Sequence, residues 1–116
     1  IPAQGMGVFA CKKNAWVGFP SKCEGFGGEE FFLHEKFRQA GKKTVCLSRM
    51  TWLHKFRRPN GAPYKPTHEN KFKNHIRAML EADMPIFQAL EHYESIGTEK
   101  SALNKWLSEV VSEKCN

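Results

Sequence analysis

The chain has 116 residues, is 41% hydrophobic and 12% aromatic, and carries a net charge of +6 at pH 7. This length fits one domain, and nine Phe and three Trp can build a packed core, which excludes a disordered chain. The basic balance favours an anionic partner, such as a nucleic acid, an anionic lipid or a phosphorylated small molecule.

The sequence contains no apolar run near the roughly 18 residues of a membrane span, and residues 1–20 lack the pattern of a signal peptide. It starts at Ile1 rather than Met, which suggests an excised or truncated segment. The wide spacing of the cysteines argues against a zinc ribbon or knuckle. We expect buried, reduced thiols in a cytoplasmic protein, although the sequence also admits one disulfide among Cys11, Cys23, Cys46 and Cys115.

The first part of the chain predicts one strand and one helix. Residues 7–11, "GVFAC", form a short apolar run typical of a buried strand, and a loop rich in Gly, Pro and Ser follows. Residues 28–40 then show an apolar stripe at helical spacing, built from Phe32, Leu33 and Phe37. Gly41 is well placed as the left-handed residue that ends this helix.

The next part predicts a second strand at residues 44–48, "TVCLS", and then a basic and aromatic segment that runs to Pro66. Three helices follow: one over residues 70–82, one capped by Asp83, and one capped by Thr98. The last carries an apolar stripe made of Leu103, Trp106, Leu107, Val110 and Val111.

The order of these elements predicts an α/β (α+β) fold. We expect a mixed segment over residues 1–66 and a helical extension over residues 67–116, together forming one compact domain.

The stretch "GFGGEE" places two adjacent carboxylates, Glu29 and Glu30, at a helix start behind a glycine loop. Glycines let a backbone approach a ligand closely, and the positive end of the helix dipole favours an ionised carboxylate. One of the pair is therefore a candidate proton acceptor or ligand for sugar hydroxyls. Acids are also common in first turns because they stabilise helices, and on the two acids alone we favour this second explanation.

The segment "TWLHKFRRP" places His54 among aromatic and basic neighbours. A neutral imidazole can bind a divalent metal, and the adjacent cations Lys55, Arg57 and Arg58 can hold phosphate. A surface histidine in a basic loop would give the same pattern.

Taken together, "GMGVFACKKNAW", "GFGGEEFFLHEKFRQAGKKTVCL" and "WLHKFRRPNGAPY" resemble the acceptor-side, C-terminal half of a family 2-like glycosyltransferase of the GT-A fold. The resemblance covers Gly5 to about Tyr64, in the family's order and with compatible spacing. It implies a partial GT-A-like unit that transfers a sugar from a nucleotide-sugar donor to a hydroxyl acceptor.

The resemblance also implies roles for individual residues. Either Glu29 or Glu30 would be the general base of an inverting enzyme, or would help bind the acceptor in a retaining one. His54 would complete the coordination of a divalent metal, Mn or Mg, on the donor diphosphate. Other implied contacts are to the diphosphate, from Arg57 and Arg58, and to the acceptor sugar, from Trp16, Gly27, Gly28 and Trp52.

The chain departs from the family in its donor side, because its single aspartate, Asp83, rules out an Asp-x-Asp motif. We therefore expect the donor site to lie in a missing N-terminal half or in another chain, and the isolated chain to be inactive. Two alternatives remain. One is a small nucleic-acid-binding module, suggested by "KFRRPNGAPYK" and "KFKNHIR", and the other is a non-catalytic interaction domain.

Overall fold

The computed structural model describes residues 3–55 and 57–113, and this part of the chain is helical without any β-strand. A short 3-10 turn, η1 (Lys13–Ala15), precedes four α-helices. The α-helices are α1 (Glu29–Gln39), α2 (His68–Glu81), α3 (Phe87–Ser95) and α4 (Lys100–Ser112). The predicted α/β class, and with it the partial GT-A-like unit with short strands, is therefore wrong.

The two predicted strands fail because neither segment finds a partner. Residues 7–11 and 44–48 have no ladder of backbone hydrogen bonds, and Val45 and Leu47 expose 72% and 61% of their surface. A β-strand is stable only beside another strand and with one face buried. The two apolar runs have the composition of buried strands, but among the described residues no other strand pairs with them and no surface buries them.

Helix α1 begins and ends where the sequence predicted. Its N-cap is Gly28, and its C-terminus closes on Gly41, which has the left-handed φ of 66°. The Gly41 amide donates to the Arg38 carbonyl and the Lys42 amide to the Phe37 carbonyl. This pair of bonds is a Schellman motif, which satisfies carbonyls at the helix end.

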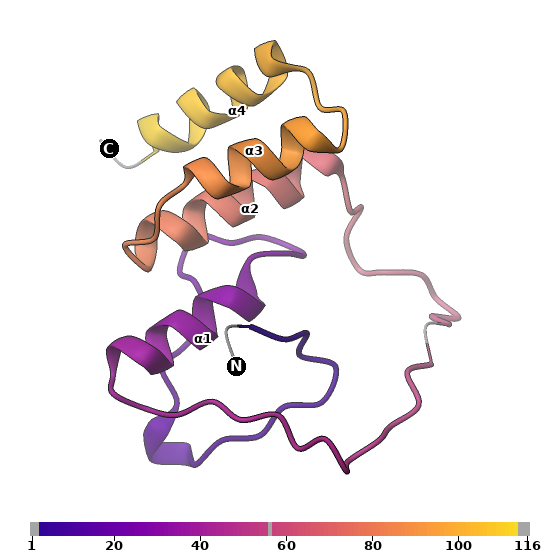
Figure 1. Cartoon of the computed structure of the whole chain (residues 1–116). Coiled ribbons are helices and arrows are strands. Elements are labelled where there is room, and N and C mark those ends of the chain that lie inside the picture. The colour runs from indigo at the N-terminus through magenta and orange to yellow at the C-terminus, as the bar shows by residue number, and fades with distance from the viewer. Residues whose placement is uncertain (1–2, 56, 114–116) are drawn as a thin grey trace.

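Helix α2 is the centre of the fold and has core on two sides (Figure 1). Its N-cap is Thr67, whose hydroxyl accepts from the Asn70 amide at 3.0 Å. Phe72, Ile76 and Met79 pack with side chains of α3 and α4. On the other side, Ala78 and Ala82 pack against α1 through Phe32, Leu33 and Phe37. The segments before and after residue 66 thus share a core.

Two predicted helix caps are wrong, although both helices are present. Asp83 does not begin α3; it has a φ of 53° and ends α2, because the Met84 amide donates to the Met79 carbonyl. Thr98 does not cap α4, whose N-cap is Glu99. The Thr98 hydroxyl instead bonds to Nε2 of His68 at 2.6 Å and so links the start of α4 to α2.

The stripe predicted along α4 is confirmed in part. Leu103 and Val110 are buried, and Trp106 and Leu107 are half-buried against the same core, whereas Val111 is 45% exposed. No helix in residues 3–55 and 57–113 is long and apolar enough to cross a membrane.

Candidate functional site

The two glycines of "GGEE" lie against α2, and their contacts explain why the chain needs them. Gly27 and Gly28 are buried and have φ values of 104° and 94°, which other residues rarely adopt. A Cβ on Gly28 would fall 2.8 Å from the backbone oxygen of Asn74. A Cβ on Gly27 would fall 3.0 Å from Cγ of Lys71. The glycines therefore permit close packing of the loop on α2.

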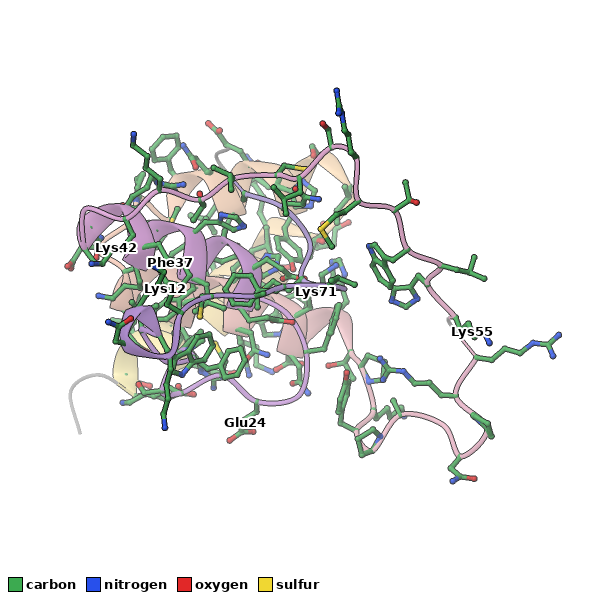
Figure 2. The ribbon with its side chains drawn as sticks, turned by 90° about the horizontal axis from the view of Figure 1, so that it is seen from below. Lys12, Glu24, Phe37, Lys42, Lys55 and Lys71 are labelled. Atoms are coloured by element: carbon green, nitrogen blue, oxygen red, sulfur yellow. The ribbon has the colours of Figure 1, made fainter. Side chains whose placement is uncertain are left out.

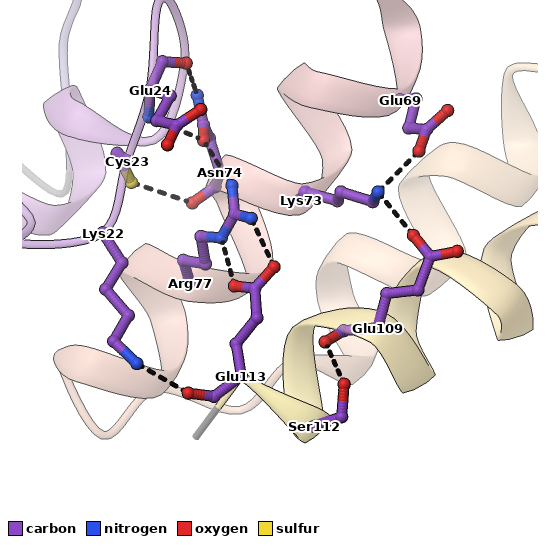
Figure 3. A network of polar contacts seen from close by, with 10 residues as sticks. All are labelled: Lys22, Cys23, Glu24, Glu69, Lys73, Asn74, Arg77, Glu109, Ser112 and Glu113. Carbon is purple, nitrogen blue, oxygen red and sulfur yellow. Dashed lines mark hydrogen bonds and ion pairs between the residues drawn. The ribbon is translucent and has the colours of Figure 1, made fainter. Parts of the chain in front are cut away.

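Asn74 holds this loop in place from the middle of α2 (Figure 3). Its side chain is buried, and its Nδ2 donates to the carbonyls of Glu24 (2.6 Å) and Phe26 (3.0 Å). Its Oδ1 accepts from the Glu24 amide (3.1 Å) and from Nη1 of Arg77 (3.3 Å). A buried amide with all these partners satisfies loop groups that would otherwise be unpaired.

The same network continues toward the end of the chain. Arg77 binds the Glu113 carboxylate with two nitrogens, at 2.9 and 2.7 Å, and the Glu113 carbonyl accepts from Nζ of Lys22 at 2.7 Å. These bonds join α2, the segment after α4 and the loop before α1 (Figure 3). The Cys23 thiol donates to the Asn74 carbonyl at 3.4 Å, and burial raises its pKa to about 11. Cys23 is therefore a protonated, structural thiol at neutral pH.

Glu29 and Glu30 follow the glycines and are both half-buried in the first turn of α1. Burial raises the pKa of the Glu30 carboxyl, and the neighbouring Glu29 raises it further, while Lys71 lowers it. The helix dipole would favour the ionised form, so at Glu30 desolvation and like-charge repulsion outweigh it. A raised pKa makes the Glu30 carboxylate more basic and therefore a stronger proton acceptor.

A cavity of about 570 Å³ lies beside this loop. The Tyr64 ring packs against Gly25, where a Cβ would lie 3.5 Å from the ring. Nζ of Lys71 lies 5.9 Å from the centre of the Phe26 ring. The cavity thus joins the glycine loop, residues 64–66 and the first turn of α2. Its lining consists of Glu24, Gly25, Phe26, Tyr64, Lys65, Pro66, Thr67, His68, Asn70 and Lys71.

Glu30 does not line the cavity, but Lys71 connects the two. Lys71 is a lining residue, packs against Gly27 and acts electrostatically on Glu30. The second neighbour of Gly27 is His75, whose ring lies 5.3 Å from Phe31 and whose Nδ1 is 3.4 Å from the Tyr93 hydroxyl. The start of α1 therefore faces a row of polar side chains on α2.

The other predicted site residues do not join this arrangement. His54 and Arg57 are exposed on the long segment between α1 and α2, and His54 lies 4.9 Å from the Trp52 ring. Trp52 lies on Gly7, and Trp16 contacts Phe9 and Phe19; neither Trp lines the cavity. Arg58 alone reaches the cavity wall, through a 3.5 Å bond from Nη1 to the Tyr64 hydroxyl.

The predicted metal at His54 finds no ligand set in the part of the chain that the structure describes. No group of three or more His, Cys, Asp or Glu side chains gathers there in a way that could hold a metal ion. His54 is exposed and belongs to no such group. The described residues therefore do not fit the divalent metal that the sequence led us to expect at His54.

Sequence reasoning gave the α2 residues that build the site, Lys71, Asn74 and His75, no part in the acceptor site and placed them only in "KFKNHIR" of the nucleic-acid alternative. One signal could have revealed them. Asn74, Ala78 and Ala82 recur every four residues, on the side of α2 opposite to Phe72 and Ile76. Such a second stripe of small residues indicates a helix that is covered on two sides. It would have placed the glycine loop against α2.

The described cysteines are unpaired, as expected, but the expected burial is wrong for Cys11 and Cys46, which are exposed. Cys11, Cys23 and Cys46 are free thiols, and Cys115 lies outside the described residues.

Comparisons of the chain with protein-family models, with curated proteins and with solved structures find no match.

Proposed function

We propose that this chain is the acceptor-binding part of a nucleotide-sugar-dependent glycosyltransferase, with Glu30 as its general base. The observation that carries the proposal is the half-buried Glu30 carboxyl, whose pKa is raised by burial and by Glu29, beside a loop that borders a cavity. The motif resemblance of residues 5–64 supports the same assignment.

The cavity has the composition that a saccharide acceptor needs. Phe26 and Tyr64 offer ring surface for the apolar face of a sugar, and Lys65, Asn70 and Lys71 offer hydrogen-bond donors for its hydroxyls. At about 570 Å³ it is of the size usual for small-ligand sites. We therefore assign the acceptor to this cavity, with its reacting hydroxyl directed toward the start of α1.

In an inverting transfer, Glu30 takes the proton of the acceptor hydroxyl as the oxygen attacks the anomeric carbon. The new glycosidic bond forms while the bond to the donor's diphosphate breaks, and the nucleoside diphosphate leaves with the bonding electrons. A raised pKa suits this role because a general base works best when its pKa approaches the working pH. In a retaining transfer, Glu30 would instead bind the acceptor.

The donor site requires residues that this chain does not bring together. The sequence has one aspartate, and the described residues contain no group of three or more His, Cys, Asp or Glu side chains that could hold a metal ion. We assign donor and metal binding to a missing N-terminal half or to another chain. Arg57 and Arg58, which are exposed, would contact the donor diphosphate.

The proposal is tested by transfer kinetics in a preparation that combines this chain with its donor-binding part. Glu30→Gln keeps the shape and removes the base, so kcat should fall by roughly 10²–10⁴ while donor binding is kept. Glu29→Gln, the matched control in the same turn, should reduce kcat much less. If both variants transfer sugar at the full rate, the acids serve the helix and the proposal is wrong.

A further inference from the structure

The positive charge of the chain is concentrated in one stretch. Residues 36–68 contain nine of the 18 Lys and Arg residues and no Asp or Glu, whereas all 12 acidic residues lie outside them. The remainder of the chain therefore carries more acids than Lys and Arg. The positive electrostatic potential should therefore be strongest along residues 36–68, which makes this stretch the expected contact for an anionic partner.

Most of this stretch lies apart from the helices. Residues 42–55, 57 and 58, which we call the basic segment, follow the end of α1, and the segment stands away from the helical body near Lys55 (Figure 2). Figure 1 shows the same separation from another side. Its cations are exposed and belong to no ion pair within the described residues: Lys42, Lys43, Arg49, Lys55, Arg57 and Arg58.

The same segment also exposes large apolar side chains between its cations. The exposed fractions are 72% for Val45, 61% for Leu47, 64% for Met50, 51% for Trp52 and 81% for Leu53. Five such side chains within nine residues are far more than the single exposed apolar residues that are normal on a soluble surface. Exposure of these apolar side chains to water is unfavourable, and the neighbouring cations attract negative charge. We therefore expect a partner that is both anionic and apolar.

An anionic lipid surface meets both requirements. Its headgroups attract Lys and Arg, and the boundary below them accepts Leu, Met and the amphipathic ring of Trp. Single-stranded nucleic acid fits the described residues less well, because it needs aromatic rings on which its bases can stack. Apart from His54, the aromatic ring among the described residues of the segment is Trp52, and this ring is partly covered by the backbone of Gly7 and by His54.

We propose that the basic segment binds this protein peripherally to anionic membranes, with Lys42, Lys43, Arg49 and Lys55 on the headgroups and Leu47, Met50 and Leu53 inserted below them. The proposal is independent of the glycosyl-transfer assignment, since it uses neither the cavity, nor Glu30, nor the two arginines assigned to the donor diphosphate.

Vesicle co-sedimentation of the 116-residue chain tests this inference. The chain should pellet with vesicles of phosphatidylcholine and phosphatidylserine, bind little to phosphatidylcholine alone, and dissociate as sodium chloride is raised. Each cation near an anionic surface contributes about fivefold in affinity. The triple variant Lys42→Glu, Lys43→Glu, Lys55→Glu should therefore bind at least about 100-fold more weakly.

Matched controls separate a local effect from net charge and from folding. Lys12→Glu, Lys13→Glu, Lys105→Glu changes three exposed lysines outside the segment by the same charge and should retain most of the binding. Leu47→Ser with Leu53→Ser leaves the charge unchanged and should weaken binding by about tenfold or more, because insertion is lost. Both leucines are exposed, so these variants should keep the far-UV circular dichroism of the parent.

Four results would overturn the proposal: equal binding to neutral and anionic vesicles, no binding at low salt, equal loss in both lysine triples, or no loss in the leucine pair. A single-stranded oligonucleotide that binds more tightly than the anionic vesicles would also overturn it, and would favour the nucleic-acid alternative.

Discussion

Replacing Gly28 by Ala should destabilise the protein strongly, because two separate costs meet at this position. The φ of 94° is strained for any residue with a Cβ, at about 1–3 kcal/mol. The added Cβ would also fall 2.8 Å from the Asn74 oxygen and 3.2 Å from Cβ of Ala78. Both neighbours belong to the middle of α2 and cannot move cheaply, so overpacking adds about 1–3 kcal/mol. We expect a total loss of about 2–6 kcal/mol.

Gly41→Ala is the matched control for this prediction. Gly41 also has a left-handed φ, 66°, but nothing lies within 4 Å of where its Cβ would be. Its replacement should cost only the backbone term, about 1–2 kcal/mol. Urea unfolding of both variants, followed by circular dichroism, gives the difference. If Gly28→Ala costs no more than Gly41→Ala, the glycine loop does not pack on α2 as described, and the explanation of "GG" fails.

Three further predictions concern the α2 network. Asn74→Ala should cost about 2–4 kcal/mol in urea unfolding, because it leaves backbone groups of Glu24 and Phe26 unpaired; a cost below about 1 kcal/mol would contradict the role of Asn74. Because the pKa of Cys23 is about 11 rather than the usual 9.0, its thiolate fraction at neutral pH should be about 100-fold lower than that of an ordinary cysteine. Alkylation should therefore modify the exposed Cys11 and Cys46 first, and equal rates at all three thiols would contradict the burial of Cys23. Burial, with help from Lys71 and His92, lowers the pKa of His75 to about 4, so the folded state prefers the neutral ring and the unfolded chain binds the proton first. Stability should therefore fall as pH drops from about 6.5 to 4, by about 2 kcal/mol, and His75→Phe should remove that part of the pH dependence in urea titrations.

Local patterns predicted the helices well because their signals are contained in each segment. The stripe of Phe32, Leu33 and Phe37 and the stop at Gly41 define α1 without reference to any other part of the chain. The apolar face of α2, with Phe72 and Ile76, is of the same kind. A helix makes its backbone hydrogen bonds within itself, so a correct period is nearly sufficient evidence for it.

The strands and the site could not be predicted in this way because they depend on distant partners. "TVCLS" has a strand's composition, yet pairing is decided by a neighbour that the described chain does not provide. The caps failed for a related reason, since Asp83 and Thr98 have the right chemistry for helix starts but are used in a turn and in a bond to His68. The two glycines of "GGEE" are likewise explained only by their close packing on α2, a contact that the local sequence does not indicate.

The ionisation of Glu30 tests the proposed function most directly within this chain. Carbon-13 NMR of the labelled glutamate carboxyls, assigned with Glu30→Gln, follows its titration with and without a panel of saccharide acceptors. We predict a pKa above the ordinary glutamate range, a lower one in Glu29→Gln because a like charge is removed, and a shift of the Glu30 signal when a saccharide binds. Tyr64→Ala should abolish that saccharide response without unfolding the chain. A Glu30 carboxyl that titrates like a free glutamate, at about 4.3, and that no saccharide perturbs would contradict its role as the acceptor's base.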